Sequence, residues 1–348
     1  MSDESQSELF SEVINALLDL SQPFPPKFLH SFSDLDSQNL QLLEQAWPRI
    51  ETGRRIALME DLEEIADADS LVYYDDIFEF ALKDHEPRIR AAAIRMMWDS
   101  DNTRYVPALI DCLQNDKDEI VRASAASALG AFMYQGELDE IPEEMRREIE
   151  NCLLDVMHSN QQKLIRRRAL ESLGFSNKDE VYNLIQKAAN SIDKDWIVSA
   201  LFAISRSADE RWTEFVLKMI DHPLDEIKAE AIRAAGELEL KSARYLLLNI
   251  LEEPEALDED VRVSTIWSLS KIGGEDVRET LEALLEDTED DEEAGIIEQA
   301  LENLEFTEGL PDLDLFDIDF VDEEELDQLI ELDSLPDEED IDQADDIL

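Results

Sequence analysis

The residues whose types and spacing could support catalysis are few in this chain of 348 residues. Its four histidines are scattered along the chain, and we find no G-x-S-x-G, H-E-x-x-H, phosphate-loop or dinucleotide-binding glycine pattern. Cys112 and Cys152 each stand beside a Leu in a helical pattern, which favours two buried small apolar residues over a disulfide or a redox site. We therefore expect no catalytic residues, no metal and no cofactor.

The densest basic cluster is the stretch KLIRRRAL, which contains Lys163, Arg166, Arg167 and Arg168. From residue 141 to residue 194 nine basic side chains balance nine acidic ones, so this region is neutral in a chain of net charge −57. We expect a structural role for Arg166. For Arg167 and Arg168, with Lys163 beside them, we hypothesise contact with an acidic tail or an acidic partner.

The net charge excludes several classes of partner. After Arg278 the chain has no Lys, Arg or His but 31 Asp and Glu. Such a chain repels phosphate backbones and anionic lipid surfaces, so we expect no direct nucleic-acid binding and no membrane binding. A protein with a basic surface is the natural electrostatic partner. The alternative is that the acidity serves only solubility or adaptation to high salt.

The C-terminal segment 305–348 contains 20 acidic and no basic side chains. Within its stretch DLDLFDIDF, acidic and apolar residues alternate with a strand-like period of two. Acidic segments with apolar anchors are typical of short recognition elements. The segment could dock onto the rest of the chain, present a motif to another protein, or stay disordered without binding anything. Its candidate partner-binding residues are Leu315, Phe316, Ile318, Phe320, Leu326, Leu329 and Ile330.

An internal repeat indicates which elements position these residues. Six segments align on one position, with steps of 30 to 44 residues between copies, and weaker copies align on Arg55 and Gly295. The six aligned residues are Arg90, Arg122, Arg166, Val198, Lys228 and Arg262.

Each repeat reads as two helices joined by a short turn. An apolar pattern of the type Leu109, Ile110, Leu113 precedes each copy and lies on one helical face. The second helix is rich in Ala, as in RASAASAL, and small residues let neighbouring helices approach closely. About eight such pairs fit between residues 37 and 304.

The short period and the pattern Asp…Val-Arg-x-x-Ala-x-x-Ala-Leu resemble the bacterial and archaeal HEAT-like repeats that were first recognised in bilin lyases. The resemblance implies an all-α, right-handed α-solenoid of about eight helix pairs with a groove. It also implies that the aligned Arg or Lys pairs with an Asp of an adjacent turn, such as Asp84, Asp116 or Asp225. This structural ladder would comprise Arg90, Arg122, Arg166, Lys228 and Arg262.

We expect three parts: residues 1–34 as an N-terminal capping helix with a Pro-rich linker, 35–304 as the solenoid, and 305–348 as the acidic tail. The amphipathic stretch SELFSEVINALLDL carries Phe10, Val13 and Leu17 on one side and would cover the first repeat. The N-terminus shows no signal-peptide pattern and no window reaches the length of a membrane span. We expect a cytoplasmic monomer.

The most consistent function is a non-enzymatic scaffold or adaptor that binds another protein along the groove, with the tail as an attachment or self-docking element. Two alternatives remain. One is a bilin lyase-like or other small-ligand enzyme on the same scaffold, and the other is an acidic chaperone or nucleic-acid mimic for basic proteins. Deoxyhypusine hydroxylase-like proteins share the scaffold but use several His-Glu pairs, whereas this chain has one, His85-Glu86, in a turn.

Overall fold

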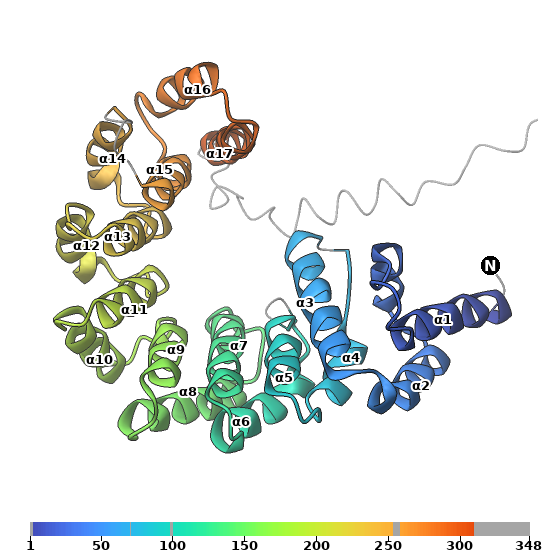
Figure 1. Cartoon of the computed structure of the whole chain (residues 1–348). Coiled ribbons are helices and arrows are strands. Elements are labelled where there is room, and N and C mark those ends of the chain that lie inside the picture. The colour runs from blue at the N-terminus through green and yellow to red at the C-terminus, as the bar shows by residue number, and fades with distance from the viewer. Residues whose placement is uncertain (1–2, 70, 98–99, 253–257, 310–348) are drawn as a thin grey trace, which may run out of the picture. The chain divides into compact units, whose positions relative to one another are not determined.

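The computed structural model describes residues 3–69, 71–97, 100–252 and 258–309, and Figure 1 traces their path. All regular structure in these ranges is helical, without strands. The chain divides into two compact units, the first ending at Ile272 and the second beginning at Gly273. None of the described helices is long and apolar enough to cross a bilayer.

The α-helices are α1 (Asp3–Leu18), α2 (Ser37–Ala46), α3 (Thr52–Ala68), α4 (Asp75–Ala81), α5 (Pro87–Arg95), α6 (Val106–Asn115), α7 (Glu119–Glu137), α8 (Glu143–His158), α9 (Lys163–Leu173), α10 (Asp179–Ala189), α11 (Lys194–Ser205), α12 (Thr213–Ile220), α13 (Asp225–Glu237), α14 (Arg244–Leu251), α15 (Glu259–Ile272), α16 (Val277–Asp287) and α17 (Asp291–Gly309). Short 3-10 helices are η1 (Pro26–Phe32), η2 (Trp47–Arg49), η3 (Thr103–Tyr105), η4 (Glu210–Trp212) and η5 (Lys241–Ala243).

The helices form the predicted series of pairs, from α2 and α3 to α16 and α17, which are eight pairs within the described part. In the first unit, α3, α5, α7, α9, α11, α13 and α15 pack against one another in chain order. Their partners α6, α8, α10, α12 and α14 cover the outer side of this row (Figure 1). The all-α solenoid expected from the repeat is confirmed.

Small residues allow the row of odd-numbered helices to pack closely. A Cβ on Gly236 of α13 would lie 2.8 Å from the Cα of Ser268 on α15, and one on Gly174 would lie 2.5 Å from the carbonyl oxygen of Ala203. Across the same interface, the Ser268 hydroxyl donates to the carbonyl of Ile232 at 2.8 Å. The buried serine thus has a partner on the neighbouring helix, as a buried polar group requires.

The N-terminal helix packs by the apolar face that the sequence indicated. Phe10, Val13 and Leu17 are buried, and the ring of Phe10 meets that of Phe32 on η1 edge-on, with centroids 5.8 Å apart. Helix α1 also contacts α2, the first helix of the repeat series.

In the second unit, α16 and α17 pack as a pair that buries Leu281 and Ile297. Gly273 and Gly274, with φ of +58° and +97°, follow the end of α15. Helix α17 runs to Gly309, past the boundary expected at residue 304. The candidate residues of the tail, from Leu315 to Ile330, lie outside the described residues, so their roles stay predictions.

Candidate functional site

The predicted ladder of cations is present in the first repeats. Arg90 of α5 donates from Nε and Nη2 to the two carboxylate oxygens of Asp116 before α7, both at 2.8 Å. Arg55 of α3 forms an ion pair with Asp84 through Nη1 alone, and the same carboxylate oxygen also accepts from the indole N–H of Trp47 at 2.7 Å. Each contact ties one repeat to the next.

The ladder changes from α7 onward, because the aligned turns no longer supply an Asp. Arg122 donates to the carbonyl of Leu113 and to Oε1 of Gln161, each at 2.7 Å. The guanidinium of Arg166 lies over the ring of Trp196, with Cζ 5.4 Å from the centroid. Arg262 on α15 also interacts with a neighbouring group.

Asp225 and Lys228 were also expected to take part in the ladder, but neither forms an ion pair among the described residues. Asp225 is the first residue of α13, and the aligned position of the preceding repeat holds Val198, which offers no cation. Lys228 occupies the aligned position of α13 without a carboxylate partner in the part of the chain that the structure describes. Polar contacts elsewhere tie these repeats together.

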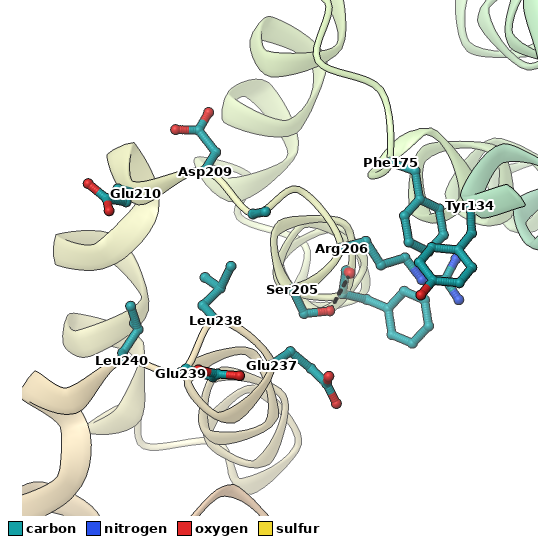
Figure 2. A pocket seen from close by; sticks show the side chains of 12 residues that line it. Tyr134, Phe175, Ser205, Arg206, Asp209, Glu210, Glu237, Leu238, Glu239 and Leu240 are labelled. Carbon is teal, nitrogen blue, oxygen red and sulfur yellow. Dashed lines mark hydrogen bonds between the residues drawn. The ribbon is translucent and has the colours of Figure 1, made fainter. Parts of the chain in front are cut away.

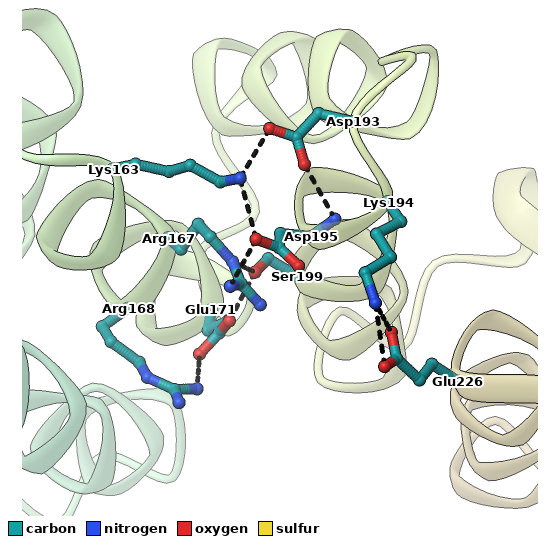
Figure 3. A network of polar contacts seen from close by, with 9 residues as sticks. All are labelled: Lys163, Arg167, Arg168, Glu171, Asp193, Lys194, Asp195, Ser199 and Glu226. Carbon is teal, nitrogen blue, oxygen red and sulfur yellow. Dashed lines mark hydrogen bonds and ion pairs between the residues drawn. The ribbon is translucent and has the colours of Figure 1, made fainter.

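The basic cluster of α9 provides such a tie, shown in Figure 3. Lys163 Nζ lies 2.6 Å from Asp193 and 2.8 Å from Asp195, both at the start of α11. Arg167 Nε donates to the Ser199 hydroxyl at 2.8 Å. These cations, which we expected to meet an acidic tail or partner, contact the next repeat of the solenoid.

Arg168 and a buried carboxylate complete this network. Arg168 Nη1 lies 2.6 Å from Oε2 of Glu171, and the Ser199 hydroxyl donates to Oε1 of the same carboxylate at 2.5 Å. The Glu171 residue is only 4% exposed. A buried charge requires this degree of compensation, so the network has a structural role that accounts for Arg167 and Arg168.

A pocket of about 690 Å³ lies at the C-terminal ends of α7, α9, α11 and α13 (Figure 2). Tyr134 of α7, Phe175 after α9 and Phe202 of α11 form its aromatic part. The rings of Tyr134 and Phe175 lie 5.2 Å apart, and Tyr134 is half exposed, at 50%. An exposed aromatic residue beside a pocket is typical of protein interfaces.

Arg206 joins the aromatic residues of this pocket. Its guanidinium carbon lies 4.9 Å from the ring of Phe175 and 4.3 Å from that of Phe202, and Nη1 donates to the carbonyl of Glu171 at 3.2 Å. Burial lowers the pKa of Arg206 and the nearby carboxylate of Glu171 opposes that change, but an arginine remains charged at neutral pH. The aromatic rings and Arg206 are thereby held in a fixed arrangement.

Four carboxylates line the rest of the pocket. Asp209 binds Arg211 at 2.6 Å and Glu237 binds Lys271 at 2.6 Å. Glu210 and Glu239 have no ion-pair partner among the described residues and are exposed. The pocket can therefore accept an apolar side chain that is flanked by basic groups.

The sequence did not indicate this pocket. Tyr134, Phe175 and Phe202 follow the aligned repeat position by twelve, nine and four residues, so no repeated motif marks them. Only recognition of bulky residues near the ends of successive second helices could have suggested them.

The other candidate residues for chemistry do not assemble into a site in the described ranges. No group of three or more His, Cys, Asp or Glu side chains there could hold a metal ion. Glu86 caps α5 by accepting from the backbone N–H of Arg88 at 3.3 Å. Cys112 is half-buried and Cys152 buried, both are free thiols, and burial raises the pKa of Cys112 to about 11.

Comparison with known proteins agrees with this architecture. Residues 74–143 and 213–302 match the family model of HEAT repeats. The chain therefore carries HEAT repeats in two regions, and the resemblance inferred from the sequence is confirmed. No curated protein matches the sequence.

Several solved structures are similar. They include the complex of CpcE and CpcF of phycocyanin lyase from Nostoc sp. PCC7120 (17% identity, TM-score 0.45, 67% of this chain and 95% of that chain covered). Human deoxyhypusine hydroxylase is similar at 16% identity and TM-score 0.33, with 88% and 98% covered. Importin beta is similar at 12% identity and TM-score 0.42, with 86% and 47% covered.

Proposed function

We propose that this protein is a non-enzymatic scaffold that binds another protein at the ends of α7, α9, α11 and α13. The pocket in Figure 2 is the observation that supports the proposal. It combines an exposed Tyr134, the rings of Phe175 and Phe202, and a rim of carboxylates. Stacked repeats hold these groups at fixed positions although they come from distant parts of the sequence.

The pocket chemistry defines the class of partner. An apolar or aromatic side chain of the partner would fill the space beside Phe175 and Phe202. Lys or Arg residues flanking that side chain would meet Glu210 and Glu239, the two carboxylates of the pocket that have no ion-pair partner among the described residues. A net charge of −57 would speed the encounter with a basic surface.

Affinity purification with the full-length chain from its native host tests the proposal. The Tyr134→Ala variant should lose the specifically captured partner, because an aromatic anchor is removed. Tyr245→Ala is a matched control, since Tyr245 on α14 is also exposed, at 56%, and does not line the pocket. Equal recovery of the partner with both variants would contradict binding at this pocket.

Two charge-reversal variants, one in the pocket and one outside it, test the contribution of the pocket's carboxylates separately. Glu210→Lys should weaken capture and make it less sensitive to salt, because it removes attraction to a basic partner. Glu214→Lys, which makes the same charge change nearby on α12, should leave capture unchanged.

A further inference from the structure

A second pocket, of about 410 Å³, lies where the ends of α8, α9, α10 and α11 meet. Its chemistry differs from that of the first pocket, because three basic side chains and no carboxylate line it. The lining residues are Met157, His158, Ser159, Arg166, Leu184, Lys187, Ala188, Ser191 and Trp196. An entirely basic set of charges is unexpected in a protein of net charge −57.

Arg166 has unused hydrogen-bonding capacity in this pocket. Its Nε is buried without a hydrogen-bond partner among the described residues, while its guanidinium lies over Trp196. The lack of a partner follows from the turn before α11. In the earlier repeat, Arg90 binds Asp116 in the turn before α7, and the residue that corresponds to Asp116 in the turn before α11 is Ile192. Ile192 supplies no carboxylate and is fully exposed.

Lys187 adds a second available cation. It is exposed in the last turn of α10 and has no ion-pair partner in the part of the chain that the structure describes. His158 differs, because its Nε2 lies 2.7 Å from Glu180. The pocket thus offers the guanidinium of Arg166 and the ammonium of Lys187 beside the apolar surfaces of Trp196 and Leu184.

We propose that this pocket receives residues 312–320 of the chain's own C-terminal segment, DLDLFDIDF. Charge complementarity favours this occupant, because residues 310–348 contain 18 acidic and no basic side chains. In an extended chain, Phe316, Ile318 and Phe320 share one side and Asp317 and Asp319 the other. Placed edge-on, such a segment brings phenyl groups to Trp196 and carboxylates to Arg166 and Lys187.

The cations that receive the acidic segment are therefore Arg166 and Lys187, and not the ones expected from the sequence. Lys163, Arg167 and Arg168 are already bound to carboxylates or to Ser199 within the solenoid. Arg166 and Lys187 are the neighbouring cations without such partners in the described residues. This site is separate from the pocket proposed to bind a partner protein, so each can fail without the other.

Millisecond hydrogen–deuterium exchange of the full-length protein tests the docking. Residues 312–320 should exchange more slowly than an unstructured peptide of the same sequence. Lys187→Glu should accelerate their exchange about fivefold, as expected for loss of one exposed ion pair. Lys218→Glu is the matched control, because Lys218 occupies the same place in the last turn of α12 and lies outside the pocket.

A charge exchange makes the test specific. Asp317→Lys and Asp319→Lys are introduced one at a time into the Lys187→Glu variant, and one of the two should restore slow exchange in residues 312–320, because the new lysine meets the glutamate introduced at position 187 while the remaining carboxylate still meets Arg166. Concentration independence of that protection would place the segment on its own chain, and loss of it on dilution would place the segment on a second copy. Exchange at the peptide rate in the unmodified protein, or equal acceleration by Lys187→Glu and Lys218→Glu, would overturn the proposal.

Discussion

Arg90 and Asp116 join two successive repeats through a bidentate pair, with both N···O distances at 2.8 Å. Their side chains are only 14% and 12% exposed. Removal of one partner leaves the other nearly buried and uncompensated, which costs more than loss of a surface ion pair. We expect Asp116→Ala to lower the free energy of unfolding by about 2–3 kcal/mol, measured by urea denaturation.

An exposed ion pair between repeats provides the comparison. Lys194 and Glu226 also link neighbouring repeats, but their side chains are 51% and 62% exposed. Lys194→Ala should therefore change the free energy of unfolding by no more than about 0.5 kcal/mol. Similar losses for the two variants would mean that burial does not set the strength of these contacts.

The same pair predicts a dependence on pH. Burial alone would raise the pKa of Asp116, but hydrogen bonds from Arg90 and from the backbone N–H of Asp118 outweigh it and lower the pKa below its ordinary value of 3.8. Because folding lowers this pKa, the contribution of the ionised carboxylate is complete above 3.8 and is lost as the pH falls through the lowered value. The stability difference between the unmodified protein and Asp116→Asn should therefore shrink in acid, and a difference constant from pH 7 to acid would refute this account.

Close helix contact predicts a penalty for added volume at Gly236. A Cβ there would lie 2.8 Å from the Cα of Ser268, which belongs to the backbone and cannot move aside alone. We expect Gly236→Ala to destabilise the protein by about 1–3 kcal/mol. Gly295→Ala on α17 is the control: no atom lies within 4 Å of its Cβ position, and better helix propensity should stabilise the protein by about 0.5–1 kcal/mol.

The half-buried thiol of Cys112 should react slowly with alkylating agents. Burial and the carboxylates of Asp116 and Asp111 raise its pKa from 9.0 to about 11. At pH 8 the thiolate fraction falls about hundredfold relative to an ordinary thiol, so alkylation followed by mass spectrometry should be slower by about that factor. The urea-unfolded protein is the reference, and equal rates in the folded and unfolded protein would exclude this effect of burial.

The sequence was sufficient to predict the helix pairs, because apolar spacing and Ala-rich second helices repeat with a regular period. The family resemblance also implied that the aligned cations pair with an Asp of an adjacent turn, as Arg90 does with Asp116. The same reasoning could not predict the surroundings of Arg166, because its contact with Trp196 depends on how two helices are placed in space.

The residues around Arg206 were beyond sequence analysis for a related reason. Tyr134, Phe175 and Phe202 stand at different distances from the aligned position, and only the stacking of α7, α9 and α11 brings them to one pocket. The charges of Lys163 and Arg167 were visible in the sequence, but Asp193 and Asp195, which contact them, belong to the next repeat. Composition identifies a basic cluster and leaves its partners undefined.

The polar ties between repeats join residues that are close to one repeat apart, as with Arg90 and Asp116, 26 residues apart, and Arg122 and Gln161, 39 apart. Arg167 and Ser199 are separated by 32 residues. Each of these polar contacts can therefore form as soon as one further helix pair has left the ribosome, and none of them requires a distant part of the chain. Assembly of the first unit can proceed during synthesis from its N-terminal end, with every new repeat adding to a surface that is already folded.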